Sequence, residues 1–275
     1  MLELLLKLAV GTGAFAIYRR WAKGAQPSKA GMMLTFPALN GMALAMTGSS
    51  GVTTKAASMF PMICLNGALC LALLAALDAR PRFAQRFAVP IAFAALGLWL
   101  LVAWPAPSFT LRWQILAIAI FLGAALFTSH RYAPLSPVEG LRDATSWWRD
   151  AWLWRFCALL GCLLVIAHAF ADSHEMLGKA GALPLLPLIG MTTQMQSGQR
   201  PSTNQTATIL FGPVIAMVYV LVVAWILDRT ELRAIAGHDW LADTAFVLVP
   251  AWIACIGAIL LVARALEGPS RPKAG

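Results

Sequence analysis

Long apolar runs, separated by short polar and charged stretches, follow one another along the whole chain. A helix needs about 20 apolar residues to cross the hydrocarbon core of a bilayer. Helices are also the structure in which one segment satisfies its own backbone hydrogen bonds in lipid. The pattern therefore predicts an all-α polytopic membrane protein with nine transmembrane helices. The predicted spans are residues 2–18, 30–48, 56–77, 87–104, 111–128, 153–171, 181–196, 206–227 and 242–264.

Composition supports this interpretation. Hydrophobic residues make up 60% of the 275 residues, charged residues make up 12%, and the mean hydropathy is +0.72. That leaves too few polar groups to cover a soluble globule of this size, so we expect membrane lipid to surround the chain. Basic loops facing anionic lipid account for the net charge of +9, and we expect no nucleic-acid partner.

The chain resembles itself when it is shifted by 150 positions, with ten more residues inserted near the end. The match relates spans one to four to spans six to nine and leaves the fifth span, residues 111–128, between them. Because a single crossing separates the halves, the second half should be inverted relative to the first. The matched pairs include Lys29-Ala30-Gly31 with Lys179-Ala180-Gly181, Leu77-Asp78 with Leu227-Asp228, and Val89-Pro90 with Val249-Pro250.

The repeat divides the chain into four parts. Residues 1–105 form a first four-helix repeat, and residues 153–267 form a second, inverted one. Residues 106–152 supply the central transmembrane helix and a cytoplasmic interfacial helix, and residues 268–275 form a tail. Nine crossings place 15 of the 21 basic residues on one side and 6 on the other. The positive-inside rule then predicts a bacterial inner (plasma) membrane protein with its N-terminus outside and its C-terminus in the cytoplasm.

Two prolines at corresponding places interrupt the second and seventh spans, namely Pro37 and Pro187. Proline removes a backbone donor, and the carbonyl that it frees needs another partner or a hydrated cavity. Interrupted spans at matching places in two halves point to the binding site of a transporter. A simple helix kink is the alternative interpretation.

The connections that follow these spans are rich in hydroxyl and amide groups and carry cations. They enter from opposite faces, so they could form paired gates. A helix N-terminus beside a cation favours an anionic or phosphate-bearing ligand. Short polar turns and ordinary helix capping explain the same residues. The candidates are Thr53, Thr54 and Lys55 in the first half and Gln194, Gln196, Arg200, Asn204 and Gln205 in the second.

Polar side chains inside the spans are few. Asn40 and Asn66 are further candidates for substrate contact, although amides at this depth also bond neighbouring helices. No Asp or Glu falls deep within a span, so we expect no buried carboxylate to couple transport to protons. The chain carries no catalytic or metal-binding motif, so we expect neither an enzyme nor a cofactor.

Two short segments resemble a known family. They are Ala30-Gly31-Met32-Met33-Leu34-Thr35-Phe36-Pro37 and Thr208-Ile209-Leu210-Phe211-Gly212, the latter leading to Leu227-Asp228-Arg229. The pattern is similar to that of the small four-helix GlpM-like bacterial membrane proteins, and it implies a fused pair of such units. That family supplies no catalytic residues to carry over. The architecture is also similar to that of drug/metabolite-type transporters, in which two inverted halves enclose a site.

Together these features predict a secondary transporter or flippase that moves a small polar, anionic or lipid-linked solute by alternating access between two inverted repeats. An anion-selective channel would use the same polar connections as a fixed pore. An integral subunit that anchors a membrane complex is the third interpretation. Small residues such as Gly11, Gly13 and Gly161 serve either intramolecular packing or a homodimer contact.

Overall fold

The structure is a computed structural model that describes most of the chain. The described residues are 5–13, 16, 38–46, 51–131, 157–158, 160–162, 164–165, 169, 172–184, 187–188, 191–192, 195–196, 203–229 and 239–267. Every regular element within these ranges is a helix, which confirms the all-α prediction.

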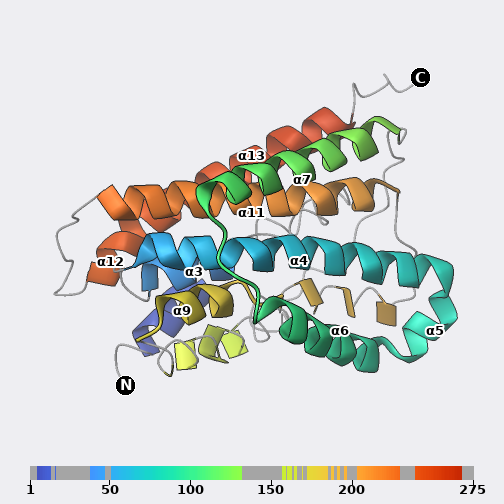
Figure 1. The fold of residues 1–275 in the computed structure, drawn as a ribbon, viewed down its shortest axis with the longest axis horizontal. Coiled ribbons are helices and arrows are strands. Elements are labelled where there is room, and N and C mark those ends of the chain that lie inside the picture. Colours follow the sequence, from blue (N-terminus) through green and yellow to red (C-terminus); the bar gives the residue numbers. More distant parts are fainter. Residues whose placement is uncertain are drawn as a thin grey trace.

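Three long helices run side by side along the long axis of the molecule (Figure 1): α4 (Val52–Ala79), α7 (Leu111–Arg131) and α11 (Thr203–Arg229). Among the described residues, they are the three helices that are long and apolar enough to cross a membrane. Shorter apolar helices cover Ala88–Ala103 and Thr244–Ile259. The helices of a membrane protein are therefore present, and the remaining predicted spans lie partly outside the described residues.

The chain direction alternates within two helical hairpins. The short helix α5 (Pro81–Arg86) follows α4 and begins with proline, which suits the first turn of a helix because its missing N–H would have no partner there. Helix α6 (Ala88–Ala103) then runs back antiparallel to α4 (Figure 1). Helix α11 is antiparallel to α4, and α13 (Val249–Glu267) is antiparallel to α11.

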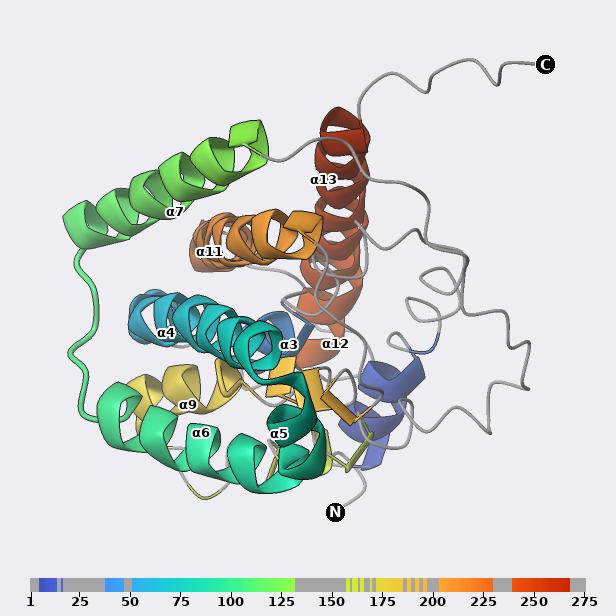
Figure 2. The same cartoon turned by 90° about the vertical axis from the view of Figure 1, so that its right-hand side faces the viewer.

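A close approach holds the long helices together near the middle of α4. A Cβ atom at Gly67 would lie only 2.7 Å from Pro213 Cγ of α11 and 2.8 Å from Phe121 Cε1 of α7. Only a residue without a side chain allows this contact. The view along the long helices in Figure 2 shows α4, α11 and α7 stacked in this order.

Proline inside α4 is compensated by a neighbouring segment. Pro61 has no N–H to donate to the carbonyl of Ala57, four residues earlier. The backbone N–H of Phe109, in the connection between α6 and α7, donates to that carbonyl at 3.0 Å. This hydrogen bond joins the connection to α4. It also satisfies the Ala57 carbonyl, which no water could satisfy in a bilayer.

Short elements gather at the end of the bundle where α4 begins (Figure 1). They are α3 (Ala38–Met46), α9 (His174–Gly181), α12 (Asp239–Asp243) and the π-helix η2 (Thr244–Leu248). Their apolar side chains join the main core, which includes fully buried Leu44, Met59 and Leu248. The predicted continuous span 242–264 is therefore divided into α12, η2 and α13.

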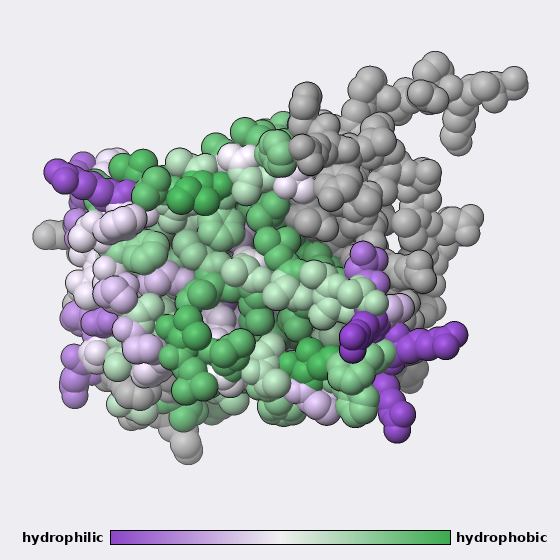
Figure 3. All heavy atoms as spheres, turned by 45° about the vertical axis from the view of Figure 1, so that its right-hand side comes forward, coloured by the Kyte–Doolittle hydropathy of each residue, from purple (hydrophilic) through white to green (hydrophobic). Residues whose placement is uncertain are grey.

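The outer surface carries the pattern of a lipid-facing protein. Figure 3 shows a hydrophobic band between two ends where hydrophilic residues collect. Large apolar side chains of α6 and α7 are strongly exposed, among them Phe93 at 72%, Leu101 at 76% and Ile120 at 60%. Such exposure would favour aggregation in water but is normal against lipid tails.

Candidate functional site

A buried lysine lies at the end of the bundle where α4 begins. The N-cap of α4 is Gly51, and Lys55 closes the first turn by donating its backbone N–H to the Gly51 carbonyl at 2.9 Å. The side chain of Lys55 is 0% exposed, whereas its neighbours Thr53 and Thr54 are exposed. Lysine is almost never fully buried unless a partner compensates its charge.

Asp243, the last residue of α12, supplies a compensating charge. It is 4% exposed, and its carboxylate acts electrostatically on the Lys55 ammonium. The two residues are far apart in sequence, so tertiary packing alone brings them together. Burying a charge without compensation is costly in a protein interior.

The carboxylate stands at a break in regular α-helical geometry. The π-helix η2 begins directly after Asp243, at Thr244. Thr244 is 5% exposed, and its hydroxyl oxygen is buried without a hydrogen-bond partner among the described residues. π-helical turns are rare and occur frequently at functional sites, where the wider turn alters the direction of side chains and carbonyls.

Helix α9 packs against the backbone of Lys55. A side chain at Gly178 would overlap both the Ser58 hydroxyl and the Lys55 carbonyl, so the two helices meet at a position without a side chain. Ser58 Oγ donates to the Lys55 carbonyl at 2.8 Å. The backbone of Lys55 is therefore fixed by α9 on one side while its charge interacts with Asp243.

A second buried lysine belongs to α9 itself. Lys179 Nζ lies 2.8 Å from Glu175 Oε1, one turn earlier, and donates to the Trp104 carbonyl at 2.8 Å. The Lys179 side chain is 5% exposed, but that of Glu175 is 45% exposed. This pair therefore reaches the surface and ties α9 to the end of α6.

Asn40 is placed at the same end of the molecule, on α3. Its Nδ2 atom is buried without a hydrogen-bond partner among the described residues. The next residue, Gly41, packs against Tyr219 of α11 and Leu248 of η2. Asn40 thus lies on an element that contacts the π-helix.

The other predicted site residues of the first half have different surroundings. Thr53 and Thr54 do not cap α4, because the N-cap residue is Gly51 and no side chain caps the helix. Asn66 Nδ2 donates to the Ala182 carbonyl at 2.8 Å, so this amide joins α4 to the chain that follows α9.

Residues of the second half lie toward the opposite end of α4. Pro187 is half-buried, and the backbone carbonyl of Gln196 accepts a hydrogen bond from Gln85 Nε2 of α5 at 3.3 Å. The 28-residue α4 is about 42 Å long, so Gln196 is far from Lys55. Asn204 and Gln205 belong to the first turn of α11, and their side chains lie outside the described residues. Pro37, Gln194 and Arg200 also lie outside them.

Sequence reasoning did not identify Asp243 as a site residue. The expectation that no buried carboxylate is available was wrong, because Asp243 is only 4% exposed on α12, which contacts α3 and η2. The physical reason is that Asp243 lies at the edge of an apolar run, where hydropathy suggests contact with water. A useful indication was the combination of an acidic residue and a threonine, Asp243-Thr244, at the start of a long apolar segment.

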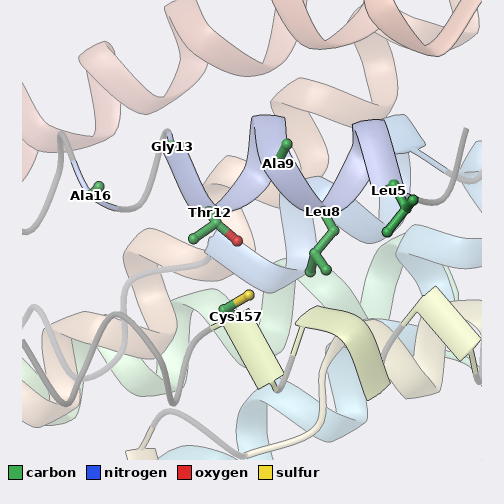
Figure 4. Close-up of a pocket in the computed structure, with 7 residues that line it drawn as sticks. All are labelled: Leu5, Leu8, Ala9, Thr12, Gly13, Ala16 and Cys157. Atoms are coloured by element: carbon green, nitrogen blue, oxygen red, sulfur yellow. The ribbon is translucent and has the colours of Figure 1, made fainter. Parts of the chain in front are cut away.

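A groove lies elsewhere, along the N-terminal segment. Its volume is about 390 Å³, and its lining is almost entirely apolar. Figure 4 shows Thr12 and Cys157 pointing into the space between their two segments, with Leu8 beside them. Such a lining suits lipid or another apolar group and offers no charge to bind a polar solute.

Metal binding has no support in the part of the chain that the structure describes, where no three His, Cys, Asp or Glu side chains come together. Comparison with known proteins adds no assignment: no family model, curated protein or solved structure matches the chain.

Proposed function

We propose that this protein is a multi-pass membrane transporter or flippase that moves a small polar, anionic solute by alternating access. The observation that carries the proposal is the fully buried Lys55, on which the buried Asp243 acts electrostatically, in a bundle of membrane-type helices. Ionisable residues within membrane segments are expensive to bury, and they commonly mark the path of a substrate or ion.

The arrangement of the two hairpins supports an inverted repeat. Helices α4 and α11, which the sequence shift places on each other, have 28 and 27 residues and run in opposite directions (Figure 1). Helices α6 and α13 are likewise matched by sequence and antiparallel, with α7 as the unmatched helix. Inverted repeats of this kind allow one half to rock against the other. We further propose that the two halves are a fused pair of GlpM-like units, as the sequence resemblance implies.

The proposed topology has nine crossings in a bacterial inner membrane, with the N-terminus outside. The exposed arginines Arg82 and Arg86 lie by α5, at the end opposite to Lys55 and Arg112. The proposal assigns the arginine-rich end to the cytoplasm because basic loops are retained there. The Lys55 site would then be near the outer face, closed in the conformation described.

Tags can test the inverted topology directly. A cysteine or fluorescent tag placed after Ala30 should report the cytoplasm, and one placed after Ala180 should report the outside. If both report the same compartment, the two halves are not inverted and alternating access by this route is excluded.

Transport is tested with the purified full chain in proteoliposomes. We expect saturable uptake of at least one labelled probe among inorganic phosphate, glycerol 3-phosphate and acetate, above that of protein-free liposomes. Lys55→Gln should abolish the uptake, while Arg112→Gln, which removes an exposed cation at the same end, should retain it. Flux without saturation would favour a channel, and no flux of any probe would favour an anchoring subunit.

A further inference from the structure

We propose that the surface of α5 binds an anionic phospholipid, with the lipid phosphate against Arg82 and Arg86 and an acyl chain against Phe83 and Phe87. Helix α5 forms the turn between α4 and α6, at the end of the bundle opposite to Lys55 (Figure 1). Lipid binding at this turn is independent of whether the protein transports a solute.

Positive charge is concentrated at this turn. Arg80, Arg82 and Arg86 follow one another closely along the chain, and all three are exposed. The sequence has no Asp or Glu between Asp78 and Glu139. No carboxylate of the described residues forms an ion pair with any of the three arginines. Within the described part of the chain, their charge is thus open to an anion from outside the protein. Arginine suits a phosphate because its planar guanidinium offers two parallel N–H donors.

The arginines of α5 face away from the bundle. Residues four apart lie about 40° from each other around a helix, so Arg82 and Arg86 share one face. Ala84 lies about 200° from Arg82, on the opposite face. It is 1% exposed and packs in an apolar cluster with Leu77 of α4 and Met195. The packing of Ala84 therefore turns the arginine face outward, toward the membrane surface.

Two aromatic rings lie beside the arginines. Phe83 and Phe87, again four apart, share a neighbouring face, and their ring centroids are 4.8 Å apart. The backbone N–H of Phe87 donates to the Phe83 carbonyl at 3.0 Å, which holds the two residues one helical turn apart. Arg86 Cζ lies 5.5 Å from the Phe87 ring centroid, so charge and ring meet directly. Both rings are exposed, and exposed apolar side chains follow on α6, among them Val89 and Phe93.

This order of groups matches a phospholipid. Its phosphate needs cations at the membrane surface, and its acyl chains need apolar side chains directly beneath. Aromatic side chains are enriched at that boundary, and clusters of basic residues there attract anionic headgroups. A soluble acidic partner would gain from the arginines, but it would have to cover rings that adjoin the lipid-facing surface of α6. A zwitterionic lipid carries its own compensating cation, so we expect selectivity for an anionic lipid.

Lipid titration of the purified full chain in detergent, followed by native mass spectrometry, tests the assignment. For the first lipid bound, phosphatidylglycerol should bind more tightly than phosphatidylcholine with the same acyl chains. Arg82→Gln/Arg86→Gln should weaken phosphatidylglycerol binding by about tenfold or more, since each arginine near an anionic headgroup adds to the attraction. Equal binding of the two lipids to the unmodified protein would overturn the proposal.

A matched control removes the same charge at the other end of the bundle. Arg112 and Arg229 are both exposed there (Figure 1). Arg112→Gln/Arg229→Gln should change phosphatidylglycerol binding by less than about twofold, because charges so far from α5 are screened by salt. Equal losses in the two double variants would show that total charge, and not the surface of α5, holds the lipid.

The aromatic pair and soluble anions separate a lipid from other sources of negative charge. Phe83→Ala/Phe87→Ala should weaken phosphatidylglycerol binding by about fivefold although both arginines remain. Inorganic phosphate and an oligoglutamate peptide carry charge without acyl chains, and neither should displace the lipid at equal concentration. Displacement by phosphate would assign a soluble anion to this surface, and displacement by the peptide would assign an acidic protein. Either result, or unchanged affinity in the phenylalanine variant, would overturn the proposal.

Hydrogen exchange of the unmodified protein keeps the test independent of how well the variants fold. The full chain is compared in nanodiscs of phosphatidylcholine alone and in nanodiscs that also contain phosphatidylglycerol. Backbone amides of α5 should exchange more slowly with phosphatidylglycerol, because a bound lipid opposes local opening of this short helix, while amides at the start of α4 should keep their rates. The same exchange of α5 in both nanodiscs would overturn the proposal.

Discussion

Two buried lysines lie at the same end of the helix bundle and differ in how their charge is compensated. Lys179 bonds to Glu175 on its own helix and to the Trp104 carbonyl, and its carboxylate partner is 45% exposed. Lys55 is 0% exposed, and Asp243, which acts on it, comes from a distant part of the chain. A local pair that reaches the surface fixes one helix. A buried lysine that a charge on a distant element acts upon responds to movement of one element against the other.

Loss of Lys55 is expected to have the largest effect on stability. Lys55→Met removes the buried cation that Asp243 acts on electrostatically, and we expect a loss of about 3–5 kcal/mol in the free energy of unfolding at neutral pH. Denaturant unfolding in detergent, followed by tryptophan fluorescence, measures this loss. Lys55→Met/Asp243→Leu should recover most of it, since both charges are then absent. If the double variant is no more stable than the single one, the two charges are not coupled.

The close contact between α9 and α4 gives an intermediate effect. Gly178→Ala places a methyl group against the Lys55 carbonyl and the Ser58 hydroxyl, and we expect it to cost about 1–3 kcal/mol. Gly97→Ala is the matched control, because no atom lies within 4 Å of a Cβ there and alanine is the better helix former. Thermal unfolding of both variants measures the difference. Equal stability would show that α9 does not fix the backbone of Lys55.

Loss of Lys179 should be milder. Lys179→Met leaves Glu175 able to turn toward water, and the principal cost is the hydrogen bond to the Trp104 carbonyl, about 1 kcal/mol. Anion uptake in proteoliposomes should remain within about twofold of the unmodified protein, in contrast to Lys55→Gln. A loss of uptake as complete as that of Lys55→Gln would remove the distinction between the two lysines.

Exposed cations should contribute least to the free energy of unfolding. Arg112→Gln at this end of the bundle and Arg82→Gln at the other should each change the free energy of unfolding by less than about 0.5 kcal/mol. The melting midpoint of each variant measures this. A larger loss in either would indicate that surface charge, rather than buried Lys55, governs stability.

The helical regions were predictable from sequence because hydropathy alone determines which segments lipid can surround. The predicted spans 56–77, 87–104 and 206–227 correspond to α4, α6 and α11, with ends that differ by a few residues. Lys55 was identified as a candidate because a cation follows two threonines at a helix start. Its complete burial was not predictable, since tertiary packing decides it, including that of α9 against the Lys55 backbone.

Asp243 and the π-helix show what local sequence lacks. An apolar run has the same hydropathy whether its turns contain α- or π-type hydrogen bonds, so the division of the predicted span 242–264 was not predicted. The electrostatic effect of Asp243 on Lys55 depends on the packing of residues separated by most of the chain. Interactions of this kind depend on the tertiary structure and cannot be read from the local sequence.

The π-helix η2 also holds more residues in its turn than an α-helix would. A π-turn accommodates one more residue than an α-turn, so tightening η2 into α-helical form would advance the register of the preceding segment by one residue. One residue on an α-helix corresponds to a rotation of about 100° and a rise of about 1.5 Å. The Asp243 carboxylate, at the border of that turn, would then move relative to Lys55 while α13 stays folded.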